Sequence, residues 1–226
     1  EGLRNNVLGT ESLVEACQSH LPQSFVLVST DKAVRPTNVM GSSKRMAELL
    51  VQDASRRWPE CRWTMVRFGN VLDSSGSVIP LFREQLNSGK PLTVTHPEVT
   101  RYFMSIGEAV RLVIQAGAMA QGGEVFLLDM GHPVKIAELA RQMIELSGYV
   151  PERDVPIQFT GLRPGEKLYE ELLIDPEQTE GTAHPRIYRA YEPLPETTTI
   201  QSEVGILKKA ITENDVEAAL SVMCSL

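Results

Sequence analysis

Short apolar runs alternate with longer amphipathic stretches along most of this 226-residue chain. Apolar runs rich in β-forming residues predict buried strands at 25–28, 64–68, 92–95 and 124–129. Apolar positions three and four residues apart predict helices at 2–20, 40–57, 79–88, 107–120 and 134–147. Because strands alternate with helices, we expect an α/β fold built on a parallel sheet.

The sequence pattern changes after Pro151, where the predicted segments are shorter and prolines recur. We expect a loop-rich lobe there, closed by one more helix. Thr212 and Asn214 each stand three residues before an acidic residue, a spacing typical of helix N-termini. This spacing predicts a terminal helix over residues 213–224.

Composition narrows the classes of function. The net charge is −7, from 29 acidic and 22 basic residues, which argues against a nucleic-acid surface. The three cysteines are far apart and the four histidines lack ligand spacing, so we expect no metal site and no disulfide frame. Apolar runs are too short to span a membrane, and no signal peptide is visible.

Residues 29–44 contain the clearest group of candidate catalytic and ligand-binding side chains. Ser29, Thr30, Asp31 and Lys32 follow directly on the predicted strand 25–28, and a helical pattern begins near Met40. Met40 and Lys44 are four residues apart, so both face the same side of that helix. A polar strand end followed by a helix that faces it is where open α/β sheets bind ligands.

This segment resembles the active-site segment of extended short-chain dehydrogenase/reductases, which carry Ser or Thr at the strand end and Tyr-x-x-x-Lys on the next helix. The motif Met40-Gly41-Ser42-Ser43-Lys44 keeps the lysine and lacks the tyrosine. Together with Thr30-Asp31-Lys32, it is similar to the CapD-like nucleotide-sugar 4,6-dehydratases of bacterial capsule, O-antigen and glycan synthesis. The resemblance covers residues 1 to about 190.

The resemblance implies a catalytic set of Thr30, Asp31, Lys32, Met40 and Lys44. Thr30 would take the proton of the sugar 4-hydroxyl, because Met40 has no ionisable proton. Asp31 would protonate the leaving C6 hydroxyl, and Lys32 would remove the C5 proton. Lys44 would hold the NAD cofactor, and its cationic surroundings favour a lowered pKa. By itself, Asp31-Lys32 could equally be a surface pair in a turn.

Ligand-binding residues are implied in the same way. The resemblance assigns NAD contacts to Ser29, Lys44, Phe68 and Gly69. It assigns contacts with a UDP-sugar to residues of four later segments, namely Asn70, Val78, Arg101, Arg163, Glu166 and Lys167. Arginine suits a diphosphate because its planar fork donates two parallel hydrogen bonds.

The chain lacks the Gly-x-Gly-x-x-Gly turn with which a Rossmann fold binds pyrophosphate. We therefore expect the C-terminal part of a longer enzyme, inactive alone and completed by its missing N-terminal part. Residues 1–72 would be the second half of an NAD-binding Rossmann domain. Residues 73–226 would be mainly a smaller substrate-binding lobe, with 107–147 returning to the sheet.

The last expectations concern the location of the protein in the cell and the other functions that its sequence allows. We expect a cytoplasmic segment that makes no membrane contact, in a full-length protein anchored to the inner membrane, with a homo-oligomer possible by analogy. Two other functions stay open. One is a nucleotide-sugar epimerase or reductase of the same superfamily, and the other is a non-catalytic nucleotide-sugar-binding module.

Overall fold

A computed structural model describes residues 1–74, 76–171 and 179–224 of the chain. Packing divides it into two compact units. Unit 1 comprises residues 1–68, 111–129 and 171–226, and unit 2 comprises residues 69–110 and 130–170. Each unit is described by itself.

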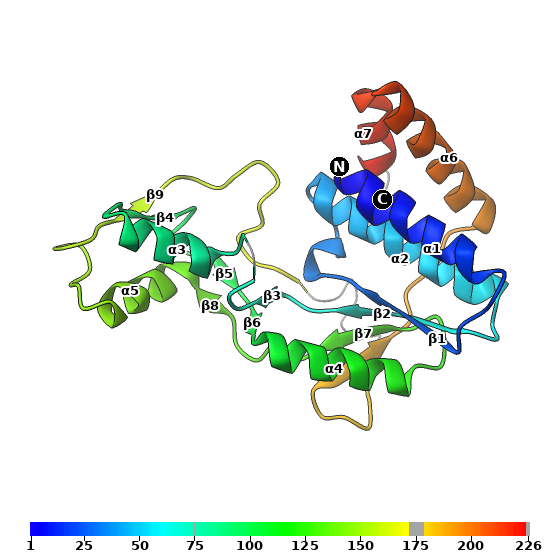
Figure 1. The fold of residues 1–226 in the computed structure, drawn as a ribbon, viewed down its shortest axis with the longest axis horizontal. Helices are drawn as coiled ribbons and strands as arrows, with labels where there is room; N and C mark the ends of the chain where they lie inside the picture. Colours follow the sequence, from blue (N-terminus) through cyan, green and yellow to red (C-terminus); the bar gives the residue numbers. More distant parts are fainter. Residues whose placement is uncertain (75, 172–178, 225–226) are drawn as a thin grey trace. The chain divides into compact units, whose positions relative to one another are not determined.

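Unit 1 is built on a mixed sheet with the strand order β1-β2-β7-β11-β10 (Figure 1). Its strands are β1 (Ser24–Val28), β2 (Arg62–Arg67), β7 (Val125–Leu128), β10 (Thr179–Gly181) and β11 (Ile187–Ala190). β1, β2 and β7 run parallel, with Val28 opposite Val66 and Arg67 opposite Leu127. β11 is antiparallel to both β7 and β10. The predicted α/β fold with a Rossmann-like parallel sheet is confirmed.

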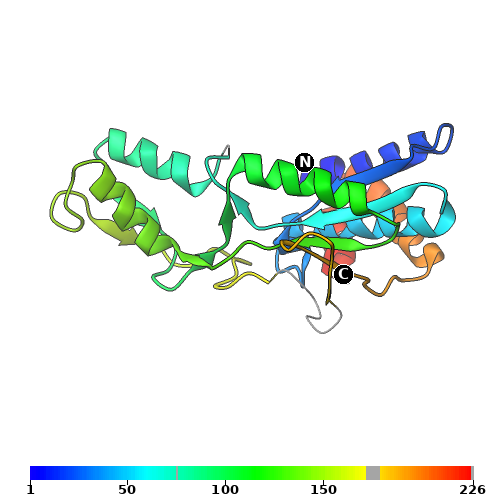
Figure 2. The same cartoon turned by 90° about the horizontal axis from the view of Figure 1, so that it is seen from below.

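Helices cover both faces of this sheet (Figures 1 and 2). On one face lie α1 (Gly9–Cys17), which follows the π-helix η1 (Arg4–Leu8), and α2 (Val39–Arg57); α4 (Ile106–Met119) lies on the other. Unit 1 also contains the 3-10 turn η2 (Asp31–Ala33), α6 (Thr197–Glu213) and α7 (Val216–Cys224). Side chains alternate along β1, as its pleat requires. Phe25 and Leu27 pack with α1 and α2, whereas Val26 lies against Gly117 of α4.

The C-terminal helices α6 and α7 pack on η1 and α2 (Figure 1). Their shared core contains Met46, Leu49 and Leu50 of α2 with Ile200, Val204 and Leu207 of α6. The sequence prediction missed α6 and began the terminal helix too early. Asn214 adopts a left-handed conformation (φ 55°) that ends α6, and the Asp215 carboxylate then caps α7 by accepting from the Ala218 amide.

Unit 2 combines short strand pairs with two helices. Its elements are β3 (Asn70–Val71), α3 (Val78–Asn87), β4 (Leu92–Val94), β5 (Thr100–Arg101), β6 (Phe103–Met104), β8 (Val134–Lys135), α5 (Ile136–Leu146) and β9 (Ile157–Phe159). β3 pairs with β6 and β4 with β9, both in parallel, and β5 pairs with β8 in antiparallel. Phe82 of α3 and Ile144 of α5 meet Leu92 in its core.

These units differ from the expected domain division. β10 and β11, expected in the substrate-binding lobe, join the sheet of unit 1, and two helical segments also pack in the other unit. Residues 136–146 form α5, which was expected to return to the sheet, and they pack in the core of unit 2. Residues 197–224 were expected in the substrate-binding lobe, and they pack in unit 1. In both places the apolar face of a helix finds its partner through tertiary contacts that the order of segments does not reveal.

Candidate active site

The polar group after β1 forms one connected set of contacts. Thr30 is extended and starts the turn η2, where its Oγ1 accepts from the Lys32 amide (3.4 Å). The same hydroxyl donates to Asp31 Oδ1 (2.8 Å), and Lys32 Nζ donates to that oxygen as well (2.9 Å). Asp31 is 0% exposed, whereas the Lys32 side chain is 23% exposed. The turn therefore pairs a buried carboxylate with a partly exposed amine.

The second carboxylate oxygen of Asp31 is also buried. Asp31 Oδ2 has no hydrogen-bond partner among the described residues. Burial without a partner is costly for a carboxylate oxygen. The alternative of a solvated Asp-Lys pair in a surface turn is therefore wrong, because the carboxylate is held inside the protein.

Helix α2 begins tightly packed against this turn. The Asn38 side chain caps the helix by accepting from the Gly41 amide (2.9 Å). A Cβ on Gly41 would stand 2.3 Å from the Lys32 carbonyl oxygen, so only glycine allows this approach. Asn6 of η1 donates to Ser43 Oγ (2.9 Å) and supports the same helical turn. The first turn of α2 and the Asp31–Lys32 turn are thus fixed to each other.

Lys44 connects α2 to the end of β1. Its Nζ donates to the Val28 carbonyl (2.7 Å), one residue before Ser29. Burial lowers the pKa of Lys44, and nearby Glu48 partly opposes this shift. A lowered pKa was predicted, but its cause here is desolvation. Met40 lies one turn earlier and is 44% exposed.

A buried charge cluster lies beneath this strand end, and the sequence analysis missed it. It consists of Arg45 and Glu48 of α2, Arg67 of β2, and Glu192, two residues after β11. Ser29 Oγ donates to Glu48 Oε1 (2.6 Å). The hydroxyl of Ser29, assigned to the cofactor by resemblance, is therefore bonded to Glu48. The sequence signal that could have revealed this cluster is the charged pair Arg45 and Glu48 inside the apolar stripe of α2.

Unit 2 brings Arg101 together with the segment 163–170. Arg101 Nη2 donates to Glu166 Oε1 (3.2 Å), and its Nε lies 3.6 Å from Glu170 Oε1. Glu166 also accepts from the Thr95 hydroxyl (3.0 Å) and from the Arg163 amide (3.1 Å). Arg101, Arg163 and Glu166, each assigned to substrate binding, thus share one polar cluster, in which carboxylates already partner the guanidinium.

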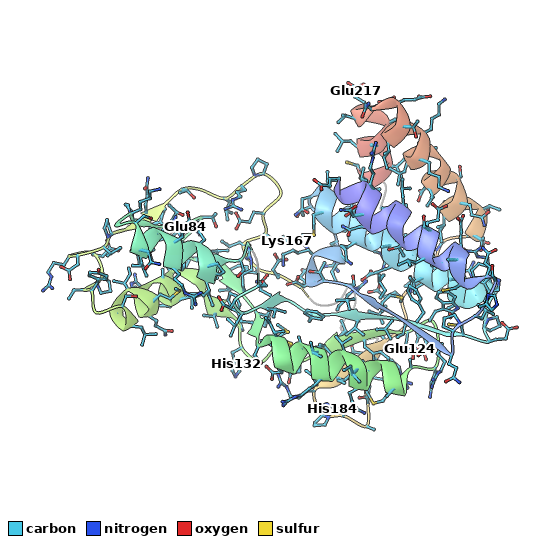
Figure 3. The ribbon with its side chains drawn as sticks, viewed as in Figure 1. Glu84, Glu124, His132, Lys167, His184 and Glu217 are labelled. Carbon is cyan, nitrogen blue, oxygen red and sulfur yellow. The ribbon has the colours of Figure 1, made fainter. Side chains whose placement is uncertain are left out.

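The remaining assigned residues are spread over unit 2. Asn70 lies in β3, where its amide donates to the Tyr102 carbonyl (3.0 Å). Val78 begins α3 and packs against the core of unit 2, while Gly69 directly precedes β3. Lys167 lies in the loop after β9 and is labelled in Figure 3. The structure therefore groups the catalytic candidates in unit 1, and all six substrate-binding candidates in unit 2.

Over residues 1–74, 76–171 and 179–224, no three His, Cys, Asp or Glu side chains lie together as a metal ion would require. Within the same ranges, every helix is too short or too polar to cross a membrane.

Comparison with known proteins identifies relatives over most of the chain. The sequence model of the polysaccharide biosynthesis protein family matches residues 1–192. The capsular polysaccharide biosynthesis protein CapD of Staphylococcus aureus is 57% identical over 189 residues, which cover 84% of this chain and 31% of CapD. The probable polysaccharide biosynthesis protein EpsC of Bacillus subtilis is 53% identical, with coverages of 83% and 31%. The chain thus spans about a third of these relatives.

More distant relatives carry other names. A protein called UDP-glucose 4-epimerase from Rickettsia prowazekii is 39% identical over 175 residues, which cover 76% of this chain and 50% of that protein. Among solved structures, Pen from Bacillus thuringiensis is 35% identical with a TM-score of 0.76, over 84% of this chain and 60% of Pen. DesIV of Streptomyces venezuelae, called a dTDP-glucose 4,6-dehydratase, has a TM-score of 0.67 at 18% identity, over 92% of this chain and 66% of DesIV, and is similar in fold alone.

Proposed function

We propose that this chain carries the catalytic part of a UDP-sugar 4,6-dehydratase. The chain belongs to the polysaccharide biosynthesis protein family, as a CapD-like short-chain dehydrogenase/reductase. UDP-N-acetylglucosamine is the substrate we propose first, and a UDP-4-keto-6-deoxy sugar is its product. The observation that supports this function is the buried Asp31 paired with Lys32 at the end of a parallel strand. An elimination needs an acid and a base side by side.

The Asp31–Lys32 pair is suited to an elimination that returns to its starting state. The elimination starts with Asp31 as a neutral acid, which has received the proton of the sugar 4-hydroxyl through Thr30, and with Lys32 as a neutral amine. Lys32 then removes the C5 proton of a 4-keto sugar, while Asp31 protonates the C6 oxygen as the C6–O bond breaks and water leaves. The amine is then charged and the carboxylate is ionised. Lys32 returns its proton to C5 when C6 is reduced, and the 4-hydroxyl proton of the next substrate protonates Asp31 again.

Thr30 is positioned to take part in the first proton transfer. Its hydroxyl donates to Asp31 Oδ1 and accepts from the Lys32 amide, so it is held between the two groups. We propose that it relays the proton of the sugar 4-hydroxyl, since Met40 has no proton to exchange. Its oxygen takes that proton while its own proton passes to Asp31 Oδ1. Each positioned proton transfer contributes about 10²- to 10⁴-fold in rate.

The residues around Lys44 fit an NAD cofactor. An ammonium group has three donors, and one of them is engaged by the Val28 carbonyl at the carboxyl end of β1. The carboxyl ends of parallel strands are where open α/β sheets bind nucleotides. We propose that Lys44, Phe68, Gly69 and the backbone of Ser29 hold NAD, which when bound supplies a hydride acceptor and donor for the sugar. A part of the protein outside these 226 residues would hold the pyrophosphate, so that this segment alone is inactive.

Unit 2 would bind the nucleotide part of the substrate. Arg101 suits a diphosphate, and we assign it that role together with Asn70, Val78, Arg163, Glu166 and Lys167. The likeness to proteins named as UDP-glucose 4-epimerases supports a UDP-sugar as the class of substrate. In this proposal the substrate replaces part of the contact between Arg101 and Glu166.

A UDP-sugar epimerase is the second candidate, supported by the 39% identity to proteins with that name. Met40 weighs against it, because an epimerase of this superfamily uses a tyrosine proton and has no use for Asp31 and Lys32. The product distinguishes the two. Full-length enzyme should be incubated with UDP-N-acetylglucosamine and other UDP- and dTDP-sugars, followed by mass spectrometry and NMR.

Loss of one water with a new methyl signal supports the dehydratase, and a product of unchanged mass supports the epimerase. An unchanged substrate in every incubation would leave only a nucleotide-sugar-binding module.

We further propose that the segment works in the cytoplasm, where UDP-sugars are made, as part of a homo-oligomer. A relative from Methanocaldococcus jannaschii is called a membrane protein, in line with an anchored full-length chain. Membrane fractionation of the full-length protein tests this location.

A further inference from the structure

The buried charge cluster of Arg45, Glu48, Arg67 and Glu192 joins three distant parts of unit 1. Arg67 donates from Nε and Nη2 to the two oxygens of Glu48 (2.8 and 2.6 Å). It donates from Nη1 and Nη2 to the two oxygens of Glu192 (2.6 and 2.8 Å). Arg45 Nη1 donates to both Glu192 (2.6 Å) and Glu48 (3.1 Å). The four charges sum to zero, and each carboxylate is shared by both guanidinium groups.

Burial makes this cluster sensitive to the loss of any member. The Arg67 and Glu48 side chains are fully buried, and the Glu192 side chain is only 5% exposed. Buried ions are tolerated only when their partners and hydrogen bonds are complete. Without the Glu192 carboxylate, Arg67 would keep two of its four bonds and Arg45 would lose its shorter one. The remaining charges would then move or admit water.

The cluster ends at the strand that carries the candidate catalytic residues. Glu48 accepts from the Ser29 hydroxyl, and Lys44, one helical turn earlier, donates to the Val28 carbonyl. Helix α2 therefore holds two successive residues at the end of β1 through two side chains on one face. Thr30, Asp31 and Lys32 follow immediately, so these two bonds help to hold them, together with the backbone bonds of Ser29 and Asp31 to the Val66 and Phe68 carbonyls.

We propose that Glu192 is a positioning residue, which fixes Glu48 through Arg45 and Arg67, and through Glu48 holds Ser29 and the turn that carries Asp31 and Lys32. It acts from the segment between β11 and α6. That segment is itself tied to α2, because Arg56 donates to the Leu194 carbonyl (3.5 Å) and Asp53 accepts from the Thr197 hydroxyl (2.6 Å). The measurement of enzyme activity rests on the proposed dehydratase function. A second measurement, hydrogen exchange, does not.

The test uses full-length protein with Glu192→Gln, the conservative variant Glu192→Asp, and Glu180→Gln as a matched control. Glu180 also pairs with an arginine in unit 1, Arg189 at 3.0 Å, but its side chain is 65% exposed. We expect Glu192→Gln to lower kcat by about 10- to 100-fold, the scale of a misplacement of about 1 Å at a reacting centre. The KM for the sugar should change little, Glu192→Asp should recover part of kcat, and Glu180→Gln should match wild type.

Hydrogen exchange gives the readout that needs no activity. In Glu192→Gln, amides of residues 26–34 should exchange faster than in wild type, because the strand end opens locally more often. Amides of α5 in unit 2 should be unchanged. If wild-type enzyme converts no nucleotide sugar, the dehydratase proposal fails and the exchange of residues 26–34 alone decides the role of Glu192.

Two outcomes would overturn the positioning role. One is wild-type exchange at residues 26–34 in Glu192→Gln. The other is an equal loss of kcat in the Gln and Asp variants, which would mean that a carboxylate at residue 192 does not restore turnover. If Glu192→Gln fails to fold, the Asp variant carries the same measurements, with a smaller expected change in both readouts.

Discussion

The two units hold their charged groups in different ways. In unit 1, Asp31 and Lys32 are neighbours in the chain, and one strand end and one helix hold them with Thr30 and Lys44. In unit 2, Arg101 meets Glu166 and Glu170 across more than sixty residues. The chemistry of unit 1 is thus carried by one local segment, while the polar cluster of unit 2 is assembled by its fold.

This difference bears on what each unit can do. Unit 1 keeps an acid and a base in contact before any substrate arrives, which suits proton transfer. In unit 2 the guanidinium of Arg101 is already partnered by carboxylates, so an anionic ligand must compete with Glu166. We therefore expect changes in unit 1 to reduce kcat and changes in unit 2 to raise KM.

The largest expected effect is that of Asp31→Asn. An amide keeps the shape of the carboxylate but cannot donate a proton to a leaving hydroxyl, so dehydration should fall by about 10²- to 10⁴-fold. The measurement is kcat of the full-length enzyme by product mass. Asp73→Asn is the matched control, because Asp73 forms an exposed pair with Arg83. Wild-type turnover in Asp31→Asn would remove Asp31 from the mechanism.

Arg101→Lys tests unit 2. Lysine cannot present the planar fork that a diphosphate accepts, so the KM for the UDP-sugar should rise about tenfold while kcat changes less. Steady-state kinetics on the full-length enzyme measure both constants. Arg83→Lys, at an exposed pair in the same unit, serves as control. A fall in kcat at constant KM would contradict the separation between the units.

Glu48→Gln tests the buried cluster through pH. Burial by itself would raise the pKa of Glu48, but Arg67, Arg45 and the Ser29 hydroxyl outweigh it and lower the pKa below the usual 4.5. The contribution of Glu48 to stability is therefore present above about pH 4.5 and is lost as pH falls through the folded-state pKa. At pH 7 the variant should lose about 3–5 kcal/mol of unfolding free energy.

Urea unfolding of wild type and Glu48→Gln at a series of pH values measures this difference. The gap between the two proteins should shrink in acid, because protonated Glu48 in the wild type no longer differs in charge from glutamine. A gap that stays constant from pH 7 to the acid limit of folding would show that charge does not determine the contribution of Glu48.

Gly41→Ala should weaken the contact between α2 and the Asp31–Lys32 turn. The added Cβ would stand 2.3 Å from a backbone oxygen, so one of the two segments must shift, at a cost of about 1–3 kcal/mol. Gly205→Ala in α6 is the control, since its Cβ meets no atom within 4 Å and should stabilise the helix by about 0.5–1 kcal/mol. Thermal unfolding compares them, and equal midpoints would contradict the close approach.

The smallest effect is expected at Glu98, on the surface of unit 2. Its pair with Lys135 (2.7 Å) joins side chains that are each about half exposed. Exposed pairs are screened by water and salt, so Glu98→Gln should leave the unfolding midpoint unchanged within error. A clear drop in the midpoint would mean that the contrast between buried and exposed pairs does not hold in this protein.

Helix α6 could have been predicted from the sequence, but it was missed. Its buried residues Ile200, Val204, Leu207 and Ala210 recur three and four positions apart, which is a helical signal. The prolines before residue 196 favoured a loop-rich end and obscured it. By contrast, α2 and α3 were predicted within one residue at each end, because their apolar stripes are long and well bounded.

The sequence by itself determined the three parallel strands of the sheet, helices α1, α2 and α4, and the segment 29–44, because neighbouring residues and short periods carry that information. Only the tertiary structure decided that Asp31 is buried, that Ser29 bonds Glu48, and that Glu192 reaches Arg67 from 125 residues away. The physical reason is burial. A charged residue in a pattern is indistinguishable from a solvated one until the fold removes its water and leaves it the partners that the chain brings near.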